Sequence, residues 1–304
     1  MTRTKQTHKG IVAMLFFVVV ILFVFGVAWA LHDDGAGRRF EQTNFEQALL
    51  PPTWFGSDTD KNYIFGSDQL GRDLFARCLV GGALSLGVGI FASLIAVCVG
   101  TLWGTIAGVR GGATDVVMMR IVDILYGLPS IMLVVLISVA ASTFVTNSSD
   151  SFVSEELINV VALFTAIGVV SWLTVSRVIR GQVKSVVTRP SLQACKVIGV
   201  SPIRTFTHHI FPAILGPIIV YATLTIPAAM LSEAFLSFLG IGIREPLPSW
   251  GNLASDGLSQ LNPVHSRWWL LFWPCLCIAS TLMLMNWLGN KLRIRLDPTL
   301  RMST

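Results

Sequence analysis

The chain has 304 residues, of which 53% are hydrophobic and only 13% are charged. Soluble chains carry roughly 25% charged residues, so this sequence lacks the polar surface that a soluble domain of this length needs, while its hydrophobicity excludes disorder. The mean hydropathy of +0.68 indicates an integral membrane protein, and the net charge of +5 has to be located along the chain before it is interpreted.

Six windows without Asp, Glu, Lys or Arg are long enough to cross a membrane, which takes about 20 apolar residues. They run over residues 10–32, 78–109, 124–149, 157–176, 205–232 and 268–290. The sequence therefore predicts an all-α integral membrane protein with six transmembrane helices. An even number of crossings places both termini on the same side of the membrane.

The distribution of cations predicts which side that is, because cytoplasmic segments carry an excess of Lys and Arg. With a cytoplasmic N-terminus, the inside segments 1–10, 110–123, 177–204 and 291–304 hold 15 of the 22 cations, and the outside segments hold 7. Both termini are therefore predicted to be cytoplasmic. The positive net charge follows from this topology and does not indicate a nucleic-acid partner.

The first window has an alternative interpretation as a cleaved signal peptide. Three cations within residues 3–9 precede an apolar run that ends near Ala28-Trp29-Ala30, which resembles a cleavage site. The run over residues 11–31 is 21 residues long, whereas the hydrophobic part of a signal peptide takes about 7–15. We therefore predict that residues 1–31 remain as a cytoplasmic tail and the first transmembrane helix.

Residues 32–77 form the predicted extracytoplasmic loop. Its segment 65–73, Phe-Gly-Ser-Asp-Gln-Leu-Gly-Arg-Asp, has glycines suited to turns, and Asp68 is suited to cap a following helix. The second crossing is rich in glycines that suit close helix packing, namely Gly81, Gly82, Gly87, Gly89, Gly100 and Gly104.

The segment from Arg177 to Pro212 holds six Lys or Arg residues, two histidines and no acid. Within it Pro190 can begin a helix and Gly199 can end one. The expected apolar face of that helix consists of Leu192, Cys195 and Ile198. Two interpretations remain open: an interfacial helix lying on anionic lipid, or a docking element for a cytoplasmic protein.

Residues 191–199, Ser-Leu-Gln-Ala-Cys-Lys-Val-Ile-Gly, with Pro212 thirteen positions after the glycine, resemble the "EAA" loop of ABC-importer permeases. This chain departs from that pattern at Gln193 for Glu, Cys195 for Ala, His209 for Ile and Phe211 for Leu. Further matches lie in residues 65–73, 231–240, 248–251 and 296–298. Together these motifs resemble the second permease subunit of the oligopeptide/dipeptide importers, over roughly residues 60–300.

The resemblance implies a type I ABC-importer permease half in the bacterial cytoplasmic (inner) membrane. Residues 78–290 would form its transmembrane domain, with the coupling loop at 177–212 and a cytoplasmic tail at 291–304. The implied partners are a second homologous permease subunit, two cytoplasmic ATPase subunits, an extracytoplasmic solute-binding protein and membrane lipid. The implied cargo is an oligopeptide or dipeptide, with nickel, glutathione or another small solute as the alternative.

In this family the EAA helix is the coupling helix that sits in a groove of the ATPase. The resemblance assigns that contact to Gln193, Ala194, Cys195, Gly199 and Pro212. Gln193 lacks the charge of the family glutamate, so a salt bridge at that position is in question while docking is not. The sequence contains no G-x-x-x-x-G-K-[ST] phosphate loop, so ATP and Mg are expected on the partner ATPase subunits, with no catalytic or cofactor-binding residue here.

Two further residues stand out near the outer side. Glu233 interrupts an apolar stretch of the fifth crossing, where a carboxylate costs a few kcal/mol, and it is either a pathway or gate residue or a packing acid. Trp250 follows Pro248 and suits either an interfacial anchor or a contact with the solute-binding protein.

Two other classes of membrane protein fit less well. An ion-coupled secondary transporter is expected to show acids or histidines within its crossings and an inverted repeat, whereas this chain offers Glu233 and no convincing repeat. An intramembrane protease needs a Ser–His pair or two Asp residues at membrane depth, and the predicted crossings contain neither. The five cysteines form no C-x-x-C pair that would predict a metal site.

Overall fold

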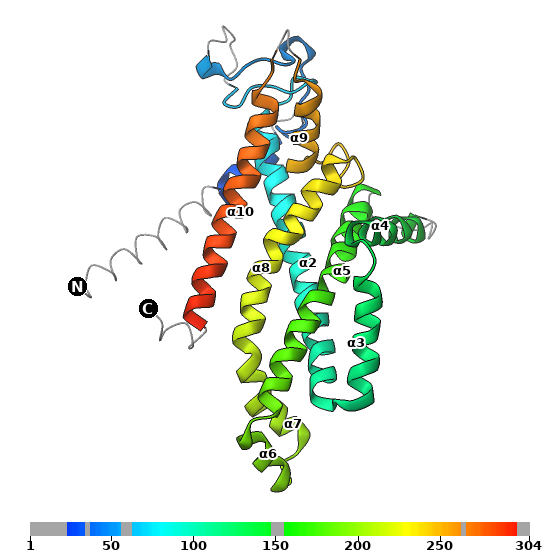
Figure 1. Ribbon diagram of the computed structural model, residues 1–304. Coiled ribbons are helices and arrows are strands. Elements are labelled where there is room, and N and C mark those ends of the chain that lie inside the picture. The colour runs from blue at the N-terminus through cyan, green and yellow to red at the C-terminus, as the bar shows by residue number, and fades with distance from the viewer. Residues whose placement is uncertain (1–22, 34–36, 56–62, 147–154, 263–265, 297–304) are drawn as a thin grey trace, which may run out of the picture. The chain divides into compact units, whose positions relative to one another are not determined.

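The computed structural model describes residues 23–33, 37–55, 63–146, 155–262 and 266–296 (Figure 1). In these residues the regular secondary structure is helical, and β-type pairing is confined to isolated bridges. The chain divides into two compact units. The first contains residues 1–85, 237–240 and 244–277, and the second contains residues 86–236, 241–243 and 278–304.

Four helical stretches of the described chain are long and apolar enough to cross a membrane. They are Leu74–Arg110, Ile158–Val187, Pro202–Phe238 and Trp269–Ile294. A further apolar pair, α3 (Gly112–Tyr126) and α4 (Ser130–Thr146), is bent by 91° at the break between the two helices and makes a fifth span if it is counted as one. The first predicted crossing lies mostly outside the described residues, and its last part, 23–31, is helical. The chain is thus an all-helical membrane protein.

The third predicted crossing, residues 124–149, is interrupted by a bend after Tyr126. The helix begins at Gly112, inside the expected cytoplasmic segment 110–123, and α3 stops before Gly127-Leu128-Pro129. Pro129 has no N–H to donate and disfavours helical conformation in the residue before it, which explains the break. Both α3 and α4 pack on α5 (Glu155–Val187) within the second unit (Figure 1).

Glycines allow α2 (Leu74–Arg110) to lie directly against α5. A Cβ on Gly104 would lie 2.5 Å from the carbonyl oxygen of Ser176, and Gly100 and Gly108 meet α5 side chains in the same way. These three glycines are four residues apart, so they share one face of α2. Gly108 adds to the predicted packing glycines, whereas a Cβ on Gly87 would meet nothing within 4 Å in the described part of this chain.

Acidic side chains of α3 hold the basic end of α5. Asp115 is 3% exposed and accepts a hydrogen bond from Arg180 Nη2 at 2.7 Å and another from Lys184. Asp123 pairs with Arg177 at 2.8 Å. Three cations of the acid-free segment 177–212 are therefore paired with acids of a neighbouring helix.

The loop segment 65–73 of the first unit is a tightly bonded turn. The carboxylate of Asp68 accepts hydrogen bonds from the backbone N–H groups of Leu70 and Arg72, and from Arg72 Nε at 2.6 Å. Gly71 has a φ of +73°, and a Cβ there would collide with the carbonyl oxygen of Asn44. Asp68 and Gly71 therefore stabilise the turn in which they both lie.

Glu245 extends this network to a distant part of the sequence. Its carboxylate lies 2.8 Å from Arg72 Nη2 and 3.2 Å from Nη2 of Arg77, a fully buried side chain. Burial alone would raise the pKa of Glu245, but hydrogen bonds and positive charge from the two arginines outweigh it and hold the pKa below its usual range. Burial raises the pKa of nearby Asp256, and the charge of Glu245 adds to that effect.

We expect Gly104→Ala to lower the Tm of the purified protein, because the new methyl group forces α2 and α5 apart at a backbone contact. Overpacking of this kind costs about 1–3 kcal/mol. Gly87→Ala is the matched control in the same helix, since its Cβ would be unopposed. Equal melting temperatures for the two variants, measured in detergent, would contradict the close α2–α5 contact.

Glu245→Gln should lower the Tm at pH 7, since it removes the charge that faces Arg72 and Arg77. Folding lowers the pKa of Glu245. Its carboxylate therefore stabilises the fold above the ordinary glutamate pKa, and this contribution is lost as the pH falls through the lowered value. The Tm difference from wild type should narrow between pH 7 and about pH 3.5. Glu46→Gln, at an exposed position, is the control. A Tm difference between Glu245→Gln and wild type that does not change with pH would contradict the ionised contact of Glu245 with the two arginines.

Candidate functional site

The predicted coupling loop folds into two short helices between α5 and α8 (Phe211–Phe238). α6 spans Pro190–Val197 and α7 spans Pro202–Thr205, followed by the π-helical turn η3, Phe206–Ile210 (Figure 1). Gly199 joins the two helices with a φ of +76°, a left-handed conformation that favours glycine. Ser201 caps α7 by accepting a hydrogen bond from the backbone N–H of Arg204.

Leu192 fixes α6 to the helices of the second unit. It is 3% exposed and belongs to the same apolar cluster as Ile179 and Val183 of α5 and Ile214 of α8. Its neighbours along α6 point elsewhere, because successive residues of a helix are rotated by about 100°. Leu192 therefore anchors α6, and Ile210 of η3, in the same cluster, anchors the end of the loop, while Gln193, Ala194 and Val197 of α6 are exposed.

The predicted ATPase-contact residues lie on the accessible side. Gln193, Ala194, Gly199 and Pro212 are exposed, and Cys195 is partly exposed. Gln193, Ala194 and Cys195 lie on α6, and Gly199 lies in the turn that follows it. Pro212 lies in the first turn of α8.

Three apolar side chains extend that accessible side. Val197, Ile198 and Ile203 are 89%, 79% and 78% exposed. Ile198 was predicted to share one apolar helical face with Leu192, but α6 ends at Val197, one residue before Ile198. We call Gln193, Ala194, Val197, Ile198, Gly199 and Ile203 the coupling surface. Clustered exposed apolar side chains mark an interface with protein or membrane.

Two departures from the EAA pattern meet beside this surface. Cys195 Sγ lies 3.8 Å from Nε2 of His209, which joins α6 to η3. The sequence places them fourteen residues apart, and only the fold reveals that they are partners.

Trp250, the first residue of α9 (Trp250–Ser259), has a structural role in the first unit. Its indole N–H donates to the carbonyl oxygen of Cys78 at 2.8 Å, and its ring lies against Gly82. With 4% of its surface exposed, the side chain offers little area to lipid or to a binding protein. The structure thus gives Trp250 a packing role in the first unit, and its contact with a solute-binding protein stays a prediction.

Glu233 is fully buried in α8 of the second unit. A cavity of about 370 Å³ lies nearby, and it is lined by Ser232 and Leu236 of the same helix but not by Glu233. A pathway role for Glu233 would therefore not pass through this cavity.

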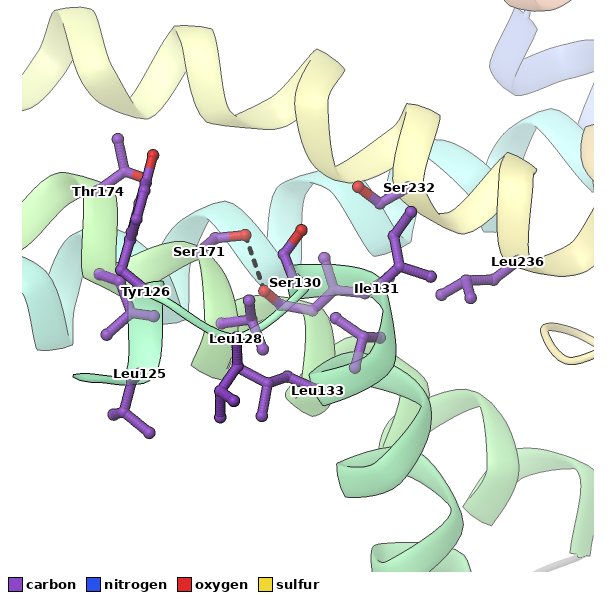
Figure 2. Close-up of a pocket in the computed structure, with 14 residues that line it drawn as sticks. Leu125, Tyr126, Leu128, Ser130, Ile131, Leu133, Ser171, Thr174, Ser232 and Leu236 are labelled. Atoms are coloured by element: carbon purple, nitrogen blue, oxygen red, sulfur yellow. Dashed lines mark hydrogen bonds between the residues drawn. The ribbon is translucent and has the colours of Figure 1, made fainter. Parts of the chain in front are cut away.

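The cavity itself was not predicted from the sequence. It lies at the break between α3 and α4, with α5 and α8 completing the wall (Figure 2). Five of its lining residues carry hydroxyl groups: Tyr126, Ser130, Ser171, Thr174 and Ser232. The Gly-Leu-Pro triplet at 127–129 was the available sequence signal, but it lies inside a continuous uncharged window.

Comparison with known proteins places these features in a family. Residues 100–302 match the family described as "Binding-protein-dependent transport system inner membrane component". The oligopeptide transport system permease protein OppC of Escherichia coli (strain K12) is 42% identical over 296 residues, which covers 97% of this chain and 89% of that protein. The dipeptide transport system permease protein DppC of Bacillus subtilis (strain 168) is 36% identical over 298 residues, covering 98% and 85%.

A solved structure shares the fold. A chain of the inward-facing MetNI methionine ABC transporter aligns with a TM-score of 0.54 over 71% of this chain and 94% of that chain, at 14% identity. The helical architecture, the match over two thirds of the sequence and the full-length relatives agree. This chain belongs to the family of binding-protein-dependent transport system inner membrane components.

Proposed function

We propose that this chain is one permease subunit of an ATP-driven ABC importer for oligopeptides or dipeptides. The proposal is supported by the relatives, which are named as oligopeptide and dipeptide transport permeases and match nearly the whole chain. The observation that carries it is the coupling surface, an accessible apolar turn fixed by Leu192 to the helix cluster of the second unit.

The proposed complex contains a second homologous permease subunit, two cytoplasmic ATPase subunits that bind ATP and Mg, and an extracytoplasmic solute-binding protein. This chain would form half of the translocation path, with six crossings and both termini in the cytoplasm. Nucleotide binding by the partner would move α6, and Leu192 would transmit that movement to α5 and α8. Packed helices of this kind switch between discrete arrangements rather than deforming continuously.

The direct test is reconstitution of the complex in liposomes with its solute-binding protein. ATP-dependent uptake of a labelled tripeptide supports the proposal. Uptake of nickel or glutathione but not peptide would support the alternative cargo, and uptake driven by an ion gradient without ATP would favour a secondary transporter.

A topology test follows from the proposed orientation. A reporter enzyme fused after Lys184 should report the cytoplasm, and one fused after Ser149, outside the described residues, should report the outer side. The excess of cations in the inside segments is the physical reason. The reverse pattern would overturn the proposed topology.

Ala194→Asp should abolish ATP-driven uptake and co-purification of the ATPase while membrane insertion remains normal. A carboxylate in a desolvated apolar contact has no partner and costs several kcal/mol. Ala194→Ser is the control, because serine is small and uncharged. Full transport by Ala194→Asp would show that the coupling surface does not contact the ATPase.

Gly199 provides a second matched pair. A residue with a Cβ pays about 1–2 kcal/mol in the left-handed conformation, and asparagine tolerates it best. Since a Cβ at Gly199 meets nothing within 4 Å, Gly199→Val and Gly199→Asn differ mainly in this backbone cost. Transport per ATP hydrolysed should fall more for Gly199→Val, and equal values would argue against a requirement for this turn.

A further inference from the structure

The cavity at the α3–α4 break combines hydroxyl groups from separate helices. Ser130 begins α4, Ser171 and Thr174 lie one turn apart on α5, and Ser232 lies on α8. Figure 2 shows these side chains around a common space, with Tyr126 at the end of α3. A volume of about 370 Å³ falls within the usual range of small-molecule sites, roughly 300–1,000 Å³.

The break itself is unusual in a membrane-spanning segment. Within a bilayer, irregular backbone is tolerated only where it is buried in protein or lines a polar cavity, because lipid cannot satisfy its N–H and C=O groups. Interrupted helices are for this reason common at substrate sites of transporters. Here Leu128, in the middle of the break, lines the cavity directly.

The lining contains no charged side chain among the described residues that form it. The guanidinium of Arg177 on α5 lies 4.0 Å from the centroid of the Tyr126 ring. Its charge is balanced by Asp123 at 2.8 Å. Glu233 is adjacent to Ser232 in the sequence but does not contribute to the wall.

The hydroxyl groups favour a ligand that both donates and accepts hydrogen bonds. Ser171 Oγ donates to the carbonyl oxygen of Ile167 at 2.7 Å, and Ser232 Oγ donates to that of Ala228 at 3.0 Å. Each of these oxygens keeps lone pairs that can accept from a ligand N–H. A serine hydroxyl can also rotate to donate to a ligand C=O.

We propose that the α3–α4 cavity binds the backbone amide groups of a peptide during its passage. This inference rests on the proposed function and adds how the path recognises its cargo. Amide groups are uncharged, supply one N–H and one C=O per residue, and are common to all peptides. A neutral wall of hydroxyl-bearing and apolar side chains therefore holds peptides without selecting the charge of their side chains.

The test places a charge in this wall within the complete reconstituted complex. Uptake of an acidic and a basic tripeptide, each presented on the solute-binding protein, is compared for wild type, Ser171→Asp and Ser171→Lys. The acidic-to-basic uptake ratio should fall by about threefold or more for Ser171→Asp and rise similarly for Ser171→Lys, because like charges repel at short range. The solute-binding protein is unchanged, so a changed ratio must originate in the permease.

Thr165→Asp and Thr165→Lys are the controls, since Thr165 is an exposed hydroxyl-bearing residue of α5 outside the cavity wall. An unchanged ratio, or an equal loss for both tripeptides, in the Ser171 variants would overturn the inference. If the charged variants do not assemble, Ser171→Ala and Ser232→Ala decide: each should slow peptide uptake by about two- to tenfold at an unchanged ATPase rate. Unchanged uptake in both alanine variants would equally overturn it.

The two proposals fail in different ways. A wild-type complex that takes up neither tripeptide would refute the proposed function. A wild-type complex that takes up both, with variants that behave like wild type, would refute the cavity inference alone.

Discussion

The anchoring of α6 through Leu192 is the constraint on which the functional organisation depends. A coupling loop that only floated at the membrane surface could move without affecting the helices. Because Leu192 is buried among side chains of α5 and α8, displacement of α6 has to displace those helices or break an apolar contact. Removing a buried leucine side chain from its core costs about 2–5 kcal/mol. This free energy therefore limits how strongly a displacement of α6 could be coupled to α5 and α8 through Leu192.

The helices that would receive the proposed movement also line the α3–α4 cavity, since α5 and α8 supply Ser171, Thr174 and Ser232 to its wall. The ion pairs of Asp115 and Asp123 tie α3 to α5, so three sides of the cavity are mechanically connected within the second unit. Glycines make α5 and α2 a close pair as well. A small set of contacts thus joins the coupling surface to the α3–α4 cavity within the second unit.

Sequence reasoning found the features that depend on local pattern. Apolar windows predicted the helical membrane class, and Pro190 and Gly199 predicted the limits of the coupling helix, whose last residue is Val197. Sequence reasoning did not predict contacts between distant residues. No local sequence pattern marks Asp115 as the partner of Arg180 or Cys195 as the partner of His209.

Burial was also beyond sequence reasoning. Trp250 suited a surface position by its residue type, yet Gly82 opens a space that its ring fills. The complete burial of Glu233 and the 91° bend after Tyr126 likewise depend on packing rather than on composition.

The proposed contact between α6 and a cytoplasmic ATPase is tested most directly by photo-crosslinking from position 194. A photoreactive phenylalanine analogue in place of Ala194 is activated in the intact complex with and without ATP. We expect a covalent adduct with the ATPase subunit in at least one nucleotide state. Adducts with lipid alone, or none in any nucleotide state, would contradict it.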